Sequence, residues 1–268
     1  MYRPPNPVRL CILWIGLALA RAGLVSREHV RRTTDLAWPR IVTGLARMSK
    51  NAVDVAMVGV AVGRTAIAGV GFASPYWGVA FSLGGGFAAG TIALVSQRFG
   101  GEAFDELGDA IRASALLVVV VTIPVAAVFW SVPYELVDLL SSERRPVELG
   151  GAYLKILALG VPFAGLNLIG SRIYIGLDDA WTPMVLRAGG AAANIGLNAV
   201  LIFGLGLGVE GAAWGTVLSN ALITCVFAVA LTAGRLPLLG DLPVQVSPTG
   251  SYAVLGDLRD LVRIGLPV

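Results

Sequence analysis

The chain has 268 residues, of which 56% are hydrophobic and 14% are charged, and its formal net charge is +3. Soluble domains carry about 25% charged residues, so this composition excludes an ordinary soluble domain and predicts a polytopic membrane protein. Basic cytoplasmic loops explain the positive excess better than nucleic-acid binding does. The two cysteines, Cys11 and Cys225, lie far apart in apolar stretches and predict neither a disulfide framework nor a metal site.

Residues 1–34 are predicted to form an amphipathic segment on the cytoplasmic side. The apolar run from Leu10 to Leu24 contains Arg21 and covers about fifteen residues, whereas a membrane span needs about twenty. A signal peptide is the alternative, but no cleavage site leads into a soluble domain, and the next segment is itself a membrane helix. We therefore expect a helix that lies on the membrane surface.

The first predicted span, residues 36–63, differs from the others because it carries charged side chains. On a helical wheel its polar residues fall within roughly 100° of arc, and these are Arg40, Thr43, Arg47, Lys50, Asn51 and Asp54. A charge at the centre of a bilayer costs about 2.5–3.5 kcal/mol even on the mild insertion scale. The polar face must therefore contact protein or a watery cavity, and a cavity inside a membrane protein indicates transport.

Five further apolar runs complete a six-helix transmembrane lobe over residues 35–233. The predicted spans are 65–97, 113–134, 151–171, 188–205 and 211–233, with polar loops at 98–112, 135–150 and 172–184. A cluster of small residues at 84–90 places Gly86 and Gly90 at GxxxG spacing, which is typical of closely packed membrane helices. The predicted fold is thus an all-α bundle embedded in a lipid bilayer.

Residues 234–257 form a linker rich in proline, glycine and serine, and 258–268 are predicted to start a seventh helix. The ending RDLVRIGLPV resembles TDLAWPRIVTG, which opens the first span, so it stands where a second six-helix unit would begin. The chain therefore looks like one half of a two-lobed protein. With the N-terminus inside, inner segments hold fourteen basic residues and outer segments four, which predicts a multi-pass protein of the cell membrane with a cytoplasmic N-terminus.

Asp54 is the only acidic residue placed well inside a predicted span, and an intramembrane carboxylate is a functional-site hypothesis by default. Lys50 precedes it by one helical turn on the same face, so a static ion pair is the alternative. Other polar side chains recur at helical spacing, namely Asn194 with Asn198, Thr216 with Asn220, and Tyr153 with Asn167. Their oxygens suit a hard cation such as Na⁺, and hydrogen bonds between helices also explain them.

The motifs of enzymes are missing from the sequence. It holds no His/Cys metal cluster, no GxSxG, and no paired acids on one helix of the kind that a membrane-embedded phosphotransferase needs for Mg²⁺. We therefore predict a protein that is not an enzyme, uses no cofactor and binds no nucleic acid.

Several stretches resemble the N-terminal half of transporters of the MATE (multidrug and toxic compound extrusion) family. They lie between residues 36 and 233 and read LAWP, NAVDVAMVG, LVSQRFG, GLDDAWTPM and NIGLNAVLIFGLGLGVEGAAWGT. The resemblance implies a twelve-helix antiporter of two lobes that exports organic cations or other amphiphiles against Na⁺ or H⁺. It also implies a cation-coupling site at Asp54, Asn194, Asn198 and Thr216, with Tyr153 nearby and Pro39 bending the first helix.

We further assign Lys50, Asn51, Asn167 and Asn220 to the cavity as supporting residues. Some family members carry an acid where Asn198 stands, so the coupling ion is open between Na⁺ and H⁺. Two alternatives remain. Flippases for lipid-linked oligosaccharides share the superfamily and line their cavities with cations, as Arg40, Arg47 and Lys50 would. A non-transporting fragment, or a partner that needs another lobe, is the second.

Overall fold

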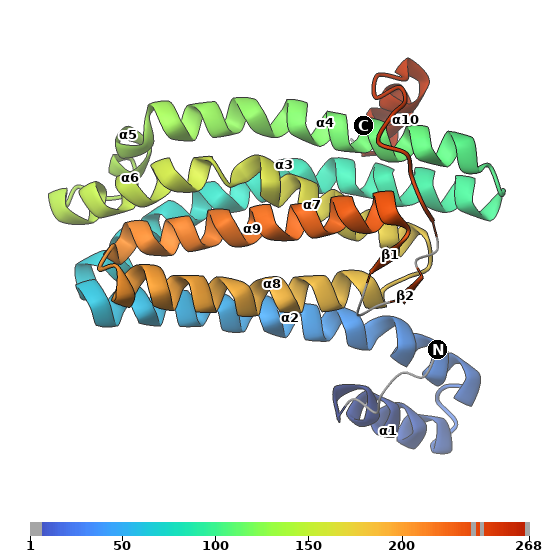
Figure 1. Cartoon of the computed structure of the whole chain (residues 1–268). Coiled ribbons are helices and arrows are strands. Elements are labelled where there is room, and N and C mark those ends of the chain that lie inside the picture. Colours follow the sequence, from blue (N-terminus) through green and yellow to red (C-terminus); the bar gives the residue numbers. More distant parts are fainter. Residues whose placement is uncertain (1–6, 237–239, 242–243, 266–268) are drawn as a thin grey trace.

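The computed structural model describes residues 7–236, 240–241 and 244–265. Its elements in chain order are α1 (Pro7–Arg21), α2 (Arg27–Val62), α3 (Arg64–Gly100), α4 (Phe104–Ser131), α5 (Pro133–Asp138), α6 (Arg144–Ala158), α7 (Val161–Gly176), α8 (Trp181–Asn198), the π-helical η1 (Ala199–Gly204), α9 (Gly208–Ala233), β1 (Arg235–Leu236), β2 (Gly240–Asp241) and α10 (Leu255–Gly265). The long helices lie side by side in one bundle, with α1, α10 and the β1–β2 pair at the same end (Figure 1). The chain is thus an all-α, polytopic protein.

Within the described ranges, four helices are long and apolar enough to cross a membrane: α3, α4, α8 with η1, and α9. The pair α6–α7 makes a fifth if its two helices, bent by 54° relative to each other, form one span. The remaining predicted span corresponds to α2, which has 36 residues but carries the polar face. The six predicted spans therefore correspond to six helical units of the structure.

The predicted loops are mostly helix. The prediction of a loop at the charged segment 98–112 is wrong, because α3 continues to Gly100 and α4 starts at Phe104. Segment 135–150 contains most of α5 and the first turns of α6, and only 177–180 of segment 172–184 lie between helices. Hydropathy marks only the apolar part of a helix, whereas these helices continue beyond it into charged turns.

Two predicted boundaries also fall inside helices. Helix α2 starts at Arg27, because the side chain of Ser26 caps it by accepting a hydrogen bond from the backbone N–H of His29 at 3.3 Å. The boundary at residue 34 therefore lies within α2, and that at residue 257 lies within α10. The predicted fourth span is broken at 159–160, where Pro162 in the first turn of α7 lacks an N–H for a continuous helix.

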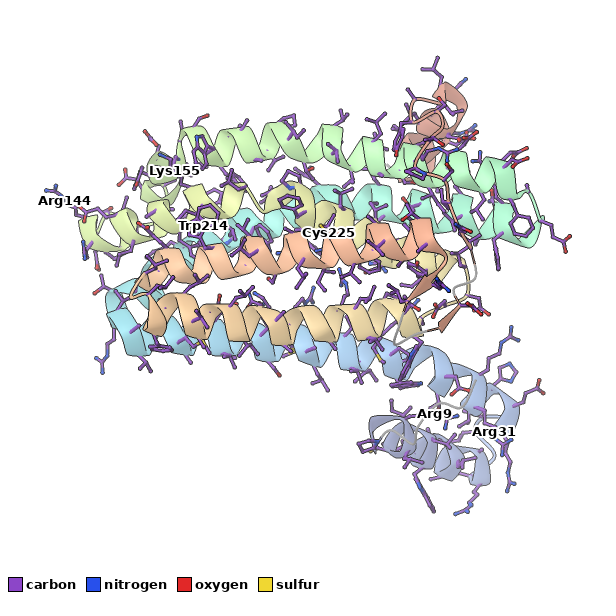
Figure 2. The ribbon with its side chains drawn as sticks, viewed as in Figure 1. Arg9, Arg31, Arg144, Lys155, Trp214 and Cys225 are labelled. Atoms are coloured by element: carbon purple, nitrogen blue, oxygen red, sulfur yellow. The ribbon has the colours of Figure 1, made fainter. Side chains whose placement is uncertain are left out.

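Helix α1 packs on the start of α2 through a 2.8 Å ion pair between Arg9 Nε and Asp35 Oδ1. Its outer side exposes Trp14 and Ile15, at 66% and 60% of their surface. Figure 2 shows Arg9 and Arg31 at this end of the bundle, while Arg144 and Lys155 lie at the opposite end. The location of α1 on a membrane surface stays a prediction.

Backbone contacts between small residues hold α3 against α6 and α10, and we call them the glycine interface. Its members are Gly69, Gly86, Gly90, Gly150 and Gly265. A Cβ on Gly150 would lie 2.6 Å from the carbonyl oxygen of Gly69, and one on Gly90 would lie 2.7 Å from that of Leu261. Such short distances require glycine, because lipid offers no hydrophobic force between helices and close packing must hold them together.

Candidate functional site

Asp54 lies in the last third of α2, and two side chains contact its carboxylate. Its Oδ2 accepts a hydrogen bond from Lys50 Nζ at 2.6 Å, one turn earlier on the same helix. Its Oδ1 accepts one from Asn198 Nδ2, also at 2.6 Å, on α8. The side chains of Asp54 and Lys50 are only 13% and 20% exposed, and inside the bundle the carboxylate contacts a cation and an amide.

The contacts continue from α8 to α9, and we call the set the polar network. Asn198 Nδ2 also donates to Asn194 Oδ1 at 3.3 Å, and Asn194 Nδ2 donates to the hydroxyls of Thr216 and Ser219, each at 3.3 Å. Asn194 and Asn198 are fully buried. The network joins three helices and comprises Lys50, Asp54, Asn194, Asn198, Thr216 and Ser219.

Local sequence explains why Asn198 reaches Asp54. Helix α8 ends at Asn198 and continues as the π-helix η1, and π-helical turns are frequent at functional sites. Gly215 on α9 faces this amide, and a Cβ there would overlap Asn198 Oδ1. Glycine at 215 is therefore what leaves room for the amide.

The polar network contains one buried acceptor atom that no described residue satisfies. Asn198 Oδ1 has no hydrogen-bond partner among the residues that the structure describes. Buried polar atoms are normally satisfied, and here the exception lies next to a carboxylate. Together with Asp54 and the Thr216 hydroxyl it offers the hard oxygen ligands that Na⁺ prefers. No group of three or more His, Cys, Asp or Glu in the described ranges is placed to hold a metal ion.

The predicted supporting residues Asn167 and Asn220 form a second set of contacts between α7 and α9. Asn167 Nδ2 donates to Asn220 Oδ1 at 3.0 Å, and the hydroxyl of Thr224 donates to Asn167 Oδ1 at 3.0 Å. Asn220 Nδ2 also donates to the backbone carbonyl of Thr216 at 2.9 Å. The hydrogen bonds between α7 and α9 fit the alternative in which these side chains hold helices together and do not bind an ion. Both asparagines also line the cavity described next.

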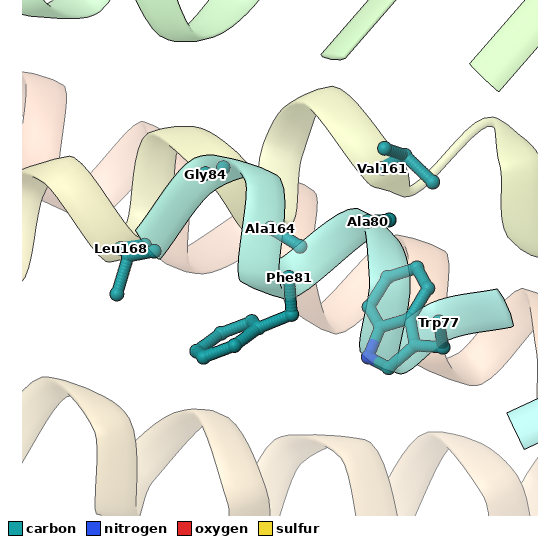
Figure 3. Close-up of a pocket in the computed structure, with 8 residues that line it drawn as sticks. Trp77, Ala80, Phe81, Gly84, Val161, Ala164 and Leu168 are labelled. Carbon is teal, nitrogen blue, oxygen red and sulfur yellow. The ribbon is translucent and has the colours of Figure 1, made fainter. Parts of the chain in front are cut away.

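A cavity of about 420 Å³ opens between α2, α3, α7, α8 and α9. Its polar wall contains Arg47, Lys50, Asn51, Asn167, Arg187, Thr216, Ser219 and Asn220, and its apolar wall contains Met48, Trp77, Phe81 and Ile223. Trp77, Phe81 and Ala164 also line a much smaller pocket of about 10 Å³ at the contact between α3 and α7 (Figure 3). Asp54 itself does not line the cavity, so Lys50 connects the carboxylate to it.

Comparison with known proteins decides the family. A family model described as MatE matches residues 39–200, which is more than half of the chain. The chain belongs to the MatE family. It is 29% identical over 205 residues to a probable multidrug resistance protein NorM of Photorhabdus laumondii, covering 76% of this chain and 45% of that protein.

Other relatives agree with this assignment. The chain is 32% identical over 207 residues to the multidrug resistance protein PmpM of Pseudomonas aeruginosa, covering 75% of this chain and 43% of the relative. Its fold is similar to a MOP superfamily transporter of Pyrococcus furiosus, described as having a binding pocket of reversed polarity, with a TM-score of 0.74 and 24% identity over 85% of this chain and 49% of that one. This MatE chain thus spans about half the length of the curated relatives that it matches.

The MatE chain brings the four predicted coupling residues together, with Tyr153 beside them, and places Pro39 elsewhere on α2. Pro39 lies fifteen residues before Asp54, about 22 Å along α2, and α2 runs through it as one helix. Tyr153 on α6 lies close to Asp54 and Thr216 and packs against an apolar cluster that includes Val58, one turn beyond Asp54. Its role and the bend at Pro39 stay predictions.

Sequence reasoning missed Ser219, Thr224 and Arg187. Ser219 and Thr224 lie on the face of α9 that carries Thr216 and Asn220, at spacings of three and four residues, so helical periodicity offered a signal for them. Arg187 directly precedes the predicted span 188–205 and is one of the fourteen basic residues that the sequence predicts on the inner side. The extension of α8 to Trp181 instead places it within the helix and on the cavity wall.

Proposed function

We propose that the chain is the N-terminal lobe of an ion-coupled exporter of small amphiphilic molecules. The observation that carries this proposal is a partly buried carboxylate, Asp54, held by Lys50 and Asn198 beside a cavity of about 420 Å³. The names of the relatives, multidrug resistance proteins, support the same function. Because the chain spans about half of their length, a second lobe is part of the proposal.

In this proposal the coupling ion acts on Asp54 by competition. A proton would neutralise the carboxylate. Na⁺ would instead bind to the carboxylate and to Asn198 Oδ1, which accepts no hydrogen bond from the described residues. Either event weakens the hold of Asp54 on Lys50, which faces the cavity. The change would bias α2 between straight and bent states at Pro39, since a ligand shifts a conformational equilibrium when it binds one state better.

The test is transport by vesicles that contain the chain with a second lobe, driven by a Na⁺ gradient or a pH gradient. We expect Asp54→Asn to abolish coupled export, because it removes the only charge that the ion can exchange with Lys50. Asp138→Asn, an exposed acid on α5, is the matched control and should leave export unchanged. Undiminished, ion-coupled export by Asp54→Asn would refute the role, and export by the 268-residue chain alone would remove the need for a second lobe.

A flippase for lipid-linked oligosaccharides is the second candidate, because Arg47 and Lys50 line the cavity and would attract phosphate groups. Translocation of such a lipid across vesicles by the two-lobe form, without export of small amphiphiles, would favour it. The cytoplasmic N-terminus is a separate prediction. Labelling of Cys11, which is exposed on α1, from one side of intact cells would test it.

A further inference from the structure

Three cationic side chains reach the cavity from two helices. Arg47 and Lys50 come from α2, and Arg187 comes from α8. Among the described residues that line the cavity there is no aspartate and no glutamate. The polar wall is therefore positively charged, with only amides and hydroxyls besides.

The three cations differ in their counter-charges. Lys50 pairs with Asp54 at 2.6 Å. In the described part of the chain, no ion pair joins Arg47 or Arg187 to a carboxylate. Arg172 and Arg47 both lie close to Arg187, and Arg172 Nε is itself buried without a partner among those residues. Arg187 is partly buried, and a partly buried cation without a counter-ion is costly, so an anion in the cavity would stabilise it.

Apolar side chains also line the cavity, and they suit an apolar body. Trp77 and Phe81 lie one turn apart on α3, where Figure 3 shows both among the residues that line the adjoining pocket. Met48 and Ile223 add to the apolar wall. A volume of about 420 Å³ is in the range of sites for drug-sized ligands, which are mostly apolar with a few placed polar groups.

We propose that this cavity binds an amphiphilic organic anion. Its carboxylate, sulfonate or phosphate group would lie between Arg47 and Arg187, because guanidinium groups match oxyanions by paired hydrogen bonds, and its apolar body would lie on Trp77 and Phe81. An organic cation of the same shape would meet like charges and bind more weakly. This substrate class rests on the proposed function, since it assigns a ligand to the same cavity.

The experiment compares two ligands of nearly one shape and opposite charge, naphthalene-2-sulfonate and (2-naphthyl)trimethylammonium. Calorimetric titration of the purified full chain in a non-ionic detergent gives both affinities. We expect the sulfonate to bind at least about tenfold more tightly, the effect of one charge-assisted contact. Competition by phosphatidic acid added to the micelle would identify a lipid headgroup as the source of the anion. Binding that persists beside the lipid would identify a free anion.

Variants locate the site. Arg187→Gln and Arg47→Gln should each weaken sulfonate binding about tenfold and leave the ammonium ligand unaffected, and Arg187→Lys should recover part of the loss. Arg47 is exposed in this lobe, so its variant folds even if Arg187→Gln does not. Arg144→Gln is the control, since that side chain is 93% exposed at the far end of the bundle (Figure 2).

The proposal is overturned by equal or tighter binding of the ammonium ligand, by sulfonate binding that neither variant changes, or by no sulfonate binding at millimolar concentration. These outcomes differ from failure of the proposed export function. Sulfonate binding that depends on Arg47 and Arg187, with no export by the two-lobe form, would refute export and leave the anion site intact.

Discussion

The polar network and the glycine interface join helices of one bundle in opposite ways. In the network, α2, α8 and α9 meet through side chains such as Asp54 and Asn198. In the glycine interface, the backbone of α3 meets that of α6 at Gly69 and Gly150. The first contact lies beside a cavity of about 420 Å³, whereas the second leaves no space for even a methyl group.

The difference teaches where this lobe can change and where it cannot. A side-chain hydrogen bond can exchange its partner for an ion or a proton while the helices stay in place. A backbone contact has no alternative partner, because tightly packed atoms lose contact as soon as they separate. The comparison predicts that damage to the glycine interface unfolds the lobe, while damage to the network changes ion response at a smaller cost in stability.

The largest expected effect is at Gly150. Gly150→Val should lower the free energy of unfolding by more than about 3 kcal/mol, because its Cβ would lie 2.6 Å from a backbone oxygen that cannot rotate away. Thermal unfolding in detergent measures it. Gly71→Ala is the control, since nothing lies within 4 Å of its added Cβ, and it should stabilise α3 by about 0.5–1 kcal/mol. Similar melting temperatures for the two variants would contradict the rigidity of the interface.

A smaller effect is expected where α10 joins the same interface. Arg98 on α3 forms an ion pair with Asp257, whose side chain is 6% exposed, and the second contact, from Nη1 to Oδ2, is 3.1 Å. Arg98→Gln should cost about 2–3 kcal/mol, because it leaves a buried carboxylate without its cation.

Because α10 has no other ion pair among the described residues, the loss of stability should be confined to α10. Hydrogen exchange should increase in α10 while the rest of the bundle stays protected. Uniform loss of protection across all helices would show that the pair stabilises the whole lobe instead. Arg144→Gln is a suitable control, since its pair with Glu148 is exposed and such pairs contribute under about 1 kcal/mol.

The smallest effect on stability is expected in the polar network. Asn198→Ala removes the hydrogen bonds to Asp54 and Asn194 and should cost about 1–2 kcal/mol. It should also abolish stabilisation by Na⁺, if Na⁺ binds there, because the amide oxygen is lost. Melting temperature as a function of NaCl and choline chloride separates the two effects. A loss above about 3 kcal/mol would place the network among the rigid contacts.

Much of this architecture could be predicted from sequence. Apolar runs, together with the polar-faced run of α2, predicted the six helical units. The polar face of α2 predicted a cavity beside it, because the cost of a charge in lipid depends on composition and helical spacing alone. The ends of the helices could not be predicted in this way. Ser26 and Pro162 set two of them through hydrogen bonding, which hydropathy does not measure.

What the sequence determined by itself is a membrane bundle with one acid, Asp54, deep inside a span. Only the tertiary structure decided the partners of that acid. Asn198 is 144 positions away in the chain, and Arg187 reaches the cavity wall because α8 packs beside α2. Helical periodicity in the sequence determines on which face of its helix a residue lies. The distant helix that meets this face follows from packing of the whole bundle.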